Sequence, residues 1–152
     1  GRCVAATADA TALAAVLVSS GKAADYAMLP DFISKEPLGP FVRNGDSPWL
    51  DIVRWTHYAM VDAEEREITR NNVDGRRQDA TDPNVRLLLG VDPGNGKALG
   101  LDEKWAFNII KQVGNYNEVF ERNVGQRSPL GFARGLNALW SKGGLMFPLP
   151  VR

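Results

Sequence analysis

The sequence predicts an α/β fold that is rich in helix, and two patterns support this. Three short apolar runs typical of β-strands fall within the first 43 residues, whereas apolar side chains recur every three or four positions from residue 47 onward, as in amphipathic helices. The composition, with 44% hydrophobic and 24% charged residues, is typical of globular proteins. A chain of 152 residues is long enough to build one compact core.

The first segment is expected to pass from a strand into a helix. Residues 4–7 form the predicted strand, and Asp9 stands between it and an alanine-rich run at residues 10–18. Alanine is the strongest helix former and Gly21 supplies a helix end. The run is therefore more typical of a buried helix than of another strand.

Two further strands are predicted over residues 26–29 and 38–43, the second of which ends at the turn 44–46. Three short strands are few for a sheet. They need partners, because an isolated strand leaves its backbone donors and acceptors unpaired.

A long helix is predicted to begin at Ser47, which is a good N-cap residue and is followed by Pro48 at a position where a missing N–H costs nothing. Its apolar stripe consists of Trp49, Ile52, Val53, Thr56, Ala59 and Met60. The charged residues 64–67 continue the helix and are expected to form a solvated face without chemistry of their own.

The remaining sequence alternates helices with polar or glycine-rich connections. Helices are expected over residues 83–89, 102–113, 116–120 and 128–143. The connections are expected over residues 71–83 and 91–100, and the apolar tail 145–152, with its two prolines, is expected to lie extended. The four tryptophans fall on helical stripes and are expected mostly in the core.

Composition and motifs exclude several classes of function. The net charge of zero argues against a nucleic-acid-binding protein, and the longest apolar stretch, residues 12–18, is too short to cross a bilayer. The glycine-rich loop 90–97 misses the spacing of a phosphate-binding loop by one residue. His57 is the only histidine and Cys3 the only cysteine, so we expect no metal site, no catalytic residue and no cofactor.

Two residues allow more than one interpretation. Asp9 either caps the helix that follows it or points into a cleft at the carboxyl end of a strand, where its carboxylate pairs with a cationic group. Cys3 is either a buried small side chain or half of a disulfide whose partner lies outside this chain.

Several long, non-repetitive stretches resemble the solute-binding proteins of general L-amino-acid ABC importers. They read ISKEPLGP at 33–40, DIVRWT at 51–56, WAFNIIKQVGNY at 105–116, FERNVG at 120–125 and RGLNALW at 134–140, with further matches at 42–43, 45–46, 49 and 142–144. The resemblance covers the whole chain, more loosely in the opening segment and between residues 71 and 100.

This resemblance implies the type II periplasmic-binding-protein fold, in which two α/β lobes close about a hinge on an amino acid and present it to an ABC permease in the inner membrane. The order of the motifs implies that this chain is the C-terminal part. Residues 1–37 would be the end of the second lobe, with strand, helix, strand and the approach to the hinge. Residues 38–152 would be the returning hinge strand and the C-terminal helices of the first lobe, and a missing N-terminal part would pair with the strands.

The resemblance also assigns a ligand residue and a compartment. The family's opening pattern is similar to Gly-Arg-Cys-Asp-Ala-x-Thr-x-Asp, whose last carboxylate contacts the ligand's α-ammonium; here that residue is Asp9, and Val4 departs from the pattern. The family works in the periplasm, where Cys3 could be oxidised with a partner in the missing part. The expected protein is a binding protein without catalysis. The alternatives are an enzyme on the same two-lobed fold, or a structural or interaction fragment that binds no ligand.

Overall fold

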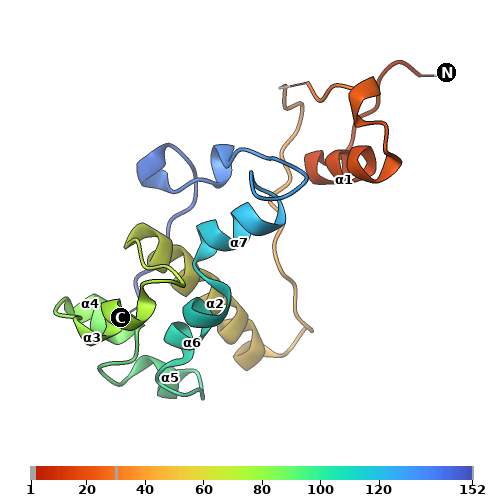
Figure 1. The fold of residues 1–152 in the computed structure, drawn as a ribbon. Helices are drawn as coiled ribbons and strands as arrows, with labels where there is room; N and C mark the ends of the chain where they lie inside the picture. The colour runs from red at the N-terminus through yellow and green to blue at the C-terminus, as the bar shows by residue number, and fades with distance from the viewer. Residues whose placement is uncertain (1–2, 30, 152) are drawn as a thin grey trace.

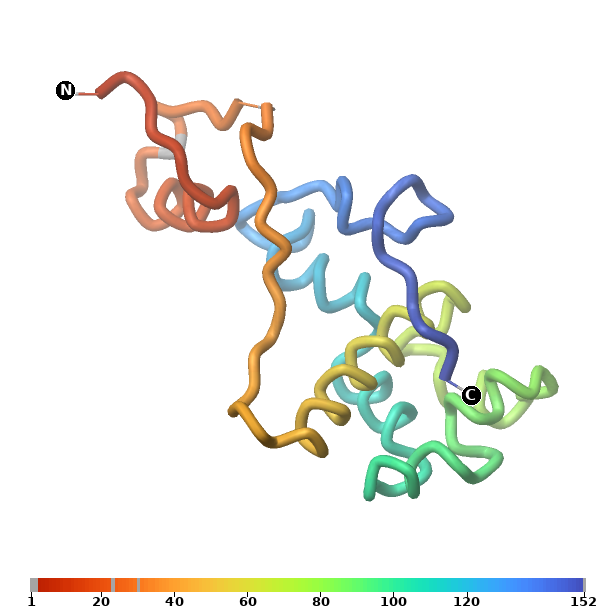
Figure 2. The backbone as a smooth tube through the Cα atoms, turned by 180° about the vertical axis from the view of Figure 1, so that it is seen from behind, coloured from red at the N-terminus to blue at the C-terminus, as the bar shows by residue number. Residues whose placement is uncertain are grey.

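The computed structural model of the chain describes residues 3–29 and 31–151 (Figure 1). Gly1, Arg2, Pro30 and Arg152, which belong to the predicted segments, lie outside the described residues. A helical body, residues 47–151, holds the core, and an N-terminal arm, residues 3–46, extends from it (Figures 1 and 2). The helix-rich character is as predicted, but no β-strand forms among the described residues, where a single bridge joins Leu139 and Met146.

The arm contains the predicted helix and lacks the predicted strands. Helix α1, Ala10–Ser20, begins after Asp9 and ends at Gly21, whose φ of 66° closes the last turn. A single 3₁₀ turn, Ala23–Asp25, follows. Residues 4–7, 26–29 and 38–43 form no strand, because no second extended segment hydrogen-bonds to them among the described residues.

Helix α2, Ser47–Glu65, is the longest helix of the body. Its N-cap is Asp46 and not Ser47: the Asp46 carboxylate accepts the N–H of Trp49 at 3.1 Å, so that Ser47 becomes the first helical residue before Pro48. Toward its C-terminal end α2 is buried on several faces, including the fully buried Ala59. The start of the helix is exposed and its end lies in the core.

Two short helices occupy segments that were predicted to be connections. Helix α3, Val73–Gln78, lies within the polar stretch 71–83, where the fully buried Val73 fastens it to the core. Helix α5, Asn95–Ala98, is a single turn within the glycine-rich stretch 91–100. Neither has the length over which apolar periodicity becomes visible. The predicted helix between them is confirmed as α4, Pro83–Leu88.

Helices α6, Trp105–Val113, and α7, Tyr116–Asn123, pack against α2 (Figure 1). Gly114 separates them as predicted, and Asn115 and Glu118 form a reciprocal capping box at the start of α7. α6 begins three residues after the predicted start. The buried core that these helices share is made of Ala59, Ala63, Ile68, Val73, Val85, Leu88, Leu89, Trp105, Ala106, Ile110 and Val151.

The helix predicted over residues 128–143 is wrong. That segment contains two 3₁₀ turns, Gly135–Asn137 and Trp140–Lys142. Gly131 and Gly135 adopt φ values of 63° and 49°, which a right-handed helix does not accommodate. The tail beyond it runs extended, as predicted, and Val151 enters the core.

The tryptophans divide between the core and the surface. Trp105 is buried and Trp55 packs against the core as a partly buried side chain, whereas Trp49 and Trp140 are exposed. The prediction that they lie mostly in the core therefore fails for two of the four.

Candidate functional site

Asp9, the predicted ligand residue, lies exposed at the N-cap of α1. One carboxylate oxygen accepts the N–H of Thr11 at 3.1 Å, and both oxygens accept the Thr11 hydroxyl, at 3.0 and 3.1 Å. The geometry is that of a helix cap, which is the first of the two interpretations that the sequence allowed. Capping and ligand binding are compatible, because each carboxylate oxygen can accept more than one hydrogen bond.

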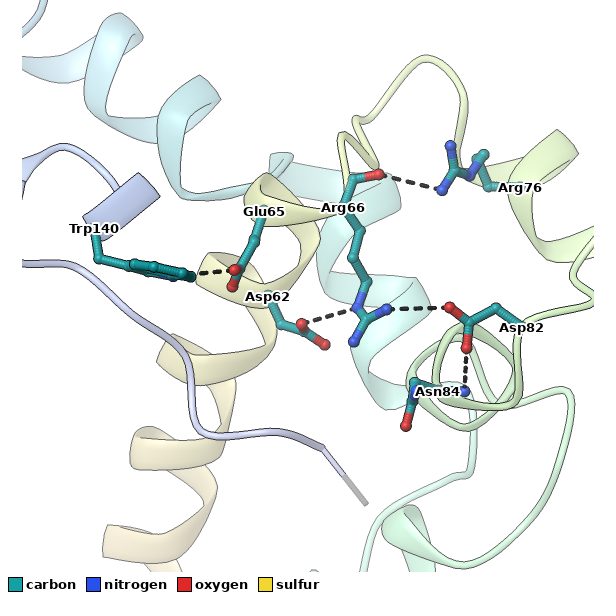
Figure 3. A network of polar contacts seen from close by, with 7 residues as sticks. All are labelled: Asp62, Glu65, Arg66, Arg76, Asp82, Asn84 and Trp140. Atoms are coloured by element: carbon teal, nitrogen blue, oxygen red, sulfur yellow. Dashed lines mark hydrogen bonds and ion pairs between the residues drawn. The ribbon is translucent and has the colours of Figure 1, made fainter. Parts of the chain in front are cut away.

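A groove of about 770 Å³ is present on the helical body. It lies between the C-terminal end of α2 and the extended tail, beside the start of α4 (Figure 3). Its lining combines charged with aromatic and proline side chains: Asp62, Glu65, Arg66, Asn84, Trp140, Phe147, Pro148 and Pro150.

The charged side chains of this groove are paired with neighbouring polar groups (Figure 3). Arg66 Nε donates to Asp62 Oδ1 at 2.9 Å, and Arg66 Nη1 lies 3.4 Å from Asp82 Oδ2. Trp140 Nε1 donates to Glu65 Oε1 at 3.0 Å and so ties the last 3₁₀ turn to α2. Burial raises the pKa of the Asp62 carboxyl, and the Arg66 guanidinium opposes that rise. These contacts fasten both the last 3₁₀ turn and the start of α4 to the C-terminal end of α2.

Arg134 is the centre of a second group of polar contacts in the body. Its guanidinium donates to the buried carboxylate of Glu64 at 3.1 Å and to Asn117 Oδ1 at 2.6 Å. It also lies over the rings of Tyr116 and Phe120, at 5.2 and 5.0 Å from their centroids. The prediction of a solvated face over residues 64–67 is thus wrong for Glu64, because an arginine 70 positions away neutralises it inside the protein.

The glycine-rich loop 90–97 binds a carboxylate of its own chain. The N–H groups of Gly94, Gly96 and Lys97 donate to the Glu103 carboxylate at 2.9, 3.0 and 3.1 Å. The Gly94 N–H, with those of Gly96 and Lys97, lowers the pKa of Glu103. The amides that a phosphate-binding loop would offer to a ligand are therefore engaged here by the protein itself.

The lone histidine and the lone cysteine lie in different settings. His57 is half-buried on α2, its ring meets that of Tyr116 edge to face at 5.4 Å, and burial lowers its pKa. Cys3 is exposed with a free thiol, which rules out the buried small side chain that the sequence allowed. Over residues 3–29 and 31–151, no group of three or more histidine, cysteine or carboxylate side chains is placed to hold a metal ion.

Sequence reasoning singled out Asp9 and missed Asp62, Glu64 and Arg134. Asp62 and Arg66 stand four positions apart on a helix, a spacing that indicates an ion pair and was available as a signal. The pairing of Glu64 with Arg134 leaves no local trace in the sequence.

No protein-family model matches the chain. It is 50% identical over its whole length to the general L-amino acid-binding periplasmic protein AapJ of Rhizobium johnstonii. It is 49% identical, again over its whole length, to the glutamate/glutamine/aspartate/asparagine-binding protein BztA of Rhodobacter capsulatus. The chain spans about half the length of these curated relatives, 45% in each case.

A solved structure matches this chain with a sequence identity close to that of the curated relatives. It is described as an ABC transporter/periplasmic binding protein from Brucella ovis with glutathione bound. The two chains are 49% identical with a TM-score of 0.87, and the match covers 92% of this chain and 44% of the solved one. Among the residues that the structure describes, no helix is long and apolar enough to cross a membrane.

Proposed function

We propose that this chain, which is homologous over its whole length to part of the amino-acid-binding proteins of ABC transporters, belongs to a periplasmic receptor that binds L-amino acids and delivers them to an ABC importer. The observation that carries the proposal is about 50% identity over all of the chain to proteins named for this activity. Identity at this level, together with a TM-score of 0.87, supports a common fold and a related role.

The ligand class follows from what the relatives are named for. One is named for L-amino acids in general and another for glutamate, glutamine, aspartate and asparagine, and the solved protein holds glutathione. All of these ligands carry an α-ammonium and an α-carboxylate on one carbon, including the γ-glutamyl end of glutathione. A carboxylate suits the α-ammonium, since a charge-assisted hydrogen bond is the strongest contact available to it. We assign that contact to Asp9.

The assignment of the lobes is part of the proposal. Residues 1–37 would end the second lobe, and residues 38–152 would return across the hinge and complete the first lobe. The part of the relatives that this chain does not match would supply the rest of the pocket, and the partner of the closed receptor would be an ABC permease in the inner membrane.

Binding is favoured over catalysis by the same relatives. Their names describe binding proteins of transporters and not enzymes, and they give no support to an enzyme on the same fold or to a fragment without ligand. The role of Asp9 in the proposal is accordingly to hold an ammonium group, with no bond made or broken.

The test is a chimera in which this chain replaces the matching part of the Rhizobium johnstonii protein. Isothermal titration calorimetry would measure binding of L-glutamate, L-asparagine and glutathione, with D-glutamate as the stereochemical control. In this chimera Asp9→Asn should weaken the binding of L-amino acids at least about tenfold, because it removes the charge while asparagine still caps α1. Asp25→Asn, at an exposed carboxylate in the next turn of the arm, is the matched control and should leave affinity unchanged.

The possible outcomes test the proposed receptor function and the assignment of Asp9 separately. A chimera that melts cooperatively and binds none of the three ligands would contradict the proposed function. Tight binding that Asp9→Asn leaves intact would remove Asp9 from the pocket without touching the function. Binding of glutathione alone would narrow the ligand class to γ-glutamyl peptides.

A further inference from the structure

Thr11 donates both its backbone N–H and its hydroxyl to the carboxylate of Asp9, the residue to which we assign the ligand's α-ammonium. The N–H donates to Oδ1 at 3.1 Å, and the hydroxyl lies 3.0 Å from Oδ1 and 3.1 Å from Oδ2. The N–H contact alone is the helix cap, because a cap satisfies a backbone N–H of the first turn. The hydroxyl contacts are therefore additional to what capping requires.

The hydroxyl of Thr11 is the donor in these contacts, because an ionised carboxylate has only acceptors. A hydroxyl carries one proton, so it donates to one oxygen of Asp9 at a time or is shared between the two. A hydrogen bond to a charged group is stronger than one between neutral groups. The two residues stand two positions apart, so the contact forms with α1 itself and needs no other part of the fold.

The contacts with Thr11 leave acceptor capacity on one oxygen of Asp9. Oδ1 receives both the N–H and the hydroxyl, which is as many hydrogen bonds as its lone pairs favour. Oδ2 receives the shared hydroxyl and no other hydrogen bond among the described residues. Asp9 is exposed, which leaves room for a ligand. An ammonium group would accordingly meet Oδ2.

Threonine is suited to holding this carboxylate in place. Its branched Cβ restricts the χ1 angle, and the Thr11 side chain is half-buried. The χ2 angle of an aspartate is broad, so the carboxylate of Asp9 would rotate without a partner. A group that is already fixed loses less conformational entropy when a ligand binds.

We propose that Thr11 is a positioning residue of the amino-acid site, and that its hydroxyl fixes the Asp9 carboxylate with Oδ2 free for the ligand's α-ammonium. The inference rests on the proposed function and deepens it, since it names a residue that acts through Asp9 and not by touching the ligand. The rival interpretation is that the hydroxyl stabilises helix α1 alone.

The substitution Thr11→Val tests the proposal, because it removes the hydroxyl and keeps both the branched shape and the N–H that caps α1. In the chimera described above it should weaken the binding of L-glutamate about fivefold to tenfold in calorimetry. Thr11→Ser restores a hydroxyl and should bind within about twofold of the parent. Ser19→Ala removes a hydroxyl that donates to the Val16 carbonyl at 3.1 Å on the same helix, and is the matched control that should leave affinity unchanged.

A double-mutant cycle shows whether Thr11 acts through Asp9. When Asp9→Asn has already removed the charge that pairs with the ammonium, Thr11→Val should weaken L-glutamate binding by less than about twofold further. Full additivity of the two losses would mean that Thr11 acts on the ligand by another route, and would overturn the positioning role.

A measurement without ligand tests the same contact in the chain alone. The couplings between the α and β protons of Asp9, measured by nuclear magnetic resonance, report which side-chain rotamer is populated. One rotamer should dominate in the parent, and Thr11→Val should bring the couplings toward averaged values. Amide exchange in α1 should stay within about twofold of the parent, because the N–H of Thr11 still donates to Asp9.

The results distinguish this inference from the proposed function. A parent chimera that melts cooperatively and binds no amino acid would contradict the proposed function and the positioning role with it. Binding by the parent that Thr11→Val leaves unchanged, or Asp9 couplings that do not respond to Thr11→Val, would overturn the positioning role alone. Faster exchange in α1 with unchanged affinity would show that the hydroxyl serves only the helix.

Discussion

The helical body and the N-terminal arm differ in how far they bury large apolar side chains of the same type. Ile110 on α6 is fully buried among the helices of the body, whereas Ile33 in the arm is 81% exposed. Leu88 and Leu89 lie in the core, whereas Leu38 is 74% exposed. The body thus builds a buried core from within its own sequence, whereas Ala14 is the one buried apolar residue among the described residues of the arm.

The difference shows which parts of a sequence can specify their structure alone. In the body, α6 and α7 lie close in sequence and both pack against α2, so burial follows from contacts that the chain itself supplies. Among the described residues of the arm, α1 is the only α-helix, and local cap signals mark both of its ends. A strand depends on a distant partner, so a segment without one stays extended and exposed.

The largest expected effect comes from matched deletions in the two regions. Ile110→Ala should lower the free energy of unfolding by about 3–4 kcal/mol, because it leaves a cavity in the core. Ile33→Ala should change it by less than about 0.5 kcal/mol, because the side chain is already exposed. Urea unfolding followed by circular dichroism would measure both. Equal costs for the two variants would mean that the arm is packed and that the contrast is wrong.

The next largest effect is expected at the buried ion pair between Glu64 and Arg134 in the body. Arg134→Met should destabilise the chain by about 2–3 kcal/mol, because it leaves the buried Glu64 carboxylate without its partner. Arg127→Met, at an exposed arginine, is the control and should cost less than about 0.5 kcal/mol. Combining Arg134→Met with Glu64→Gln should recover part of the loss in a double-mutant cycle of urea unfolding energies. Strict additivity would show that the pair does not interact.

The sequence predicted the parts of the fold that local rules control. Asp9 and Gly21 bracket α1, Pro48 lies at the start of α2, and Gly114 separates α6 from α7, all close to the predicted positions. The errors have a physical cause of their own. In residues 128–143 apolar spacing indicated a helix, but Gly131 and Gly135 adopt positive φ values, which are incompatible with a right-handed helix. Helix α3 was missed because a buried Val73, and not a periodic stripe, stabilises it.

The candidate site was predictable to a lesser degree. The capping role of Asp9 follows from its position before an alanine-rich run, whereas a ligand role requires knowledge of where the other pocket walls lie. The burial of Glu64 depends on Arg134, which is 70 positions away in the sequence. A run of charged residues is usually exposed to solvent, so the sequence alone predicted an exposed Glu64. Long-range pairing of this kind is visible only in three dimensions.

A smaller effect tests whether the arm unfolds independently of the body. Asp9→Ala should cost α1 about 1 kcal/mol, because the N–H of Thr11 loses its cap, and its amides should exchange roughly fivefold faster. Asp9→Asn should preserve the cap and the exchange rates. Exchange measured by nuclear magnetic resonance should stay unchanged in α6 for both variants. Faster exchange in α6 with Asp9→Ala would show that arm and body unfold as one unit.

The smallest effect is a pH dependence that belongs to the body. The three N–H groups around Glu103 lower its pKa in the folded state, so the folded protein holds the charged form more firmly than the unfolded chain does. Their contribution to stability is present above the ordinary value of 4.5 and is lost as the pH falls through the lowered pKa. Glu103→Gln should therefore be less stable than the parent at neutral pH, and the gap should close in acid. Glu36→Gln is the control: Glu36 is an exposed residue of the arm, and none of the hydrogen bonds or ion pairs found among the described residues involves its carboxylate, so the substitution should leave the acid dependence of the urea midpoint unchanged. A gap for Glu103→Gln that persists or widens as the pH falls would mean that the loop 90–97 does not depend on the charge of Glu103.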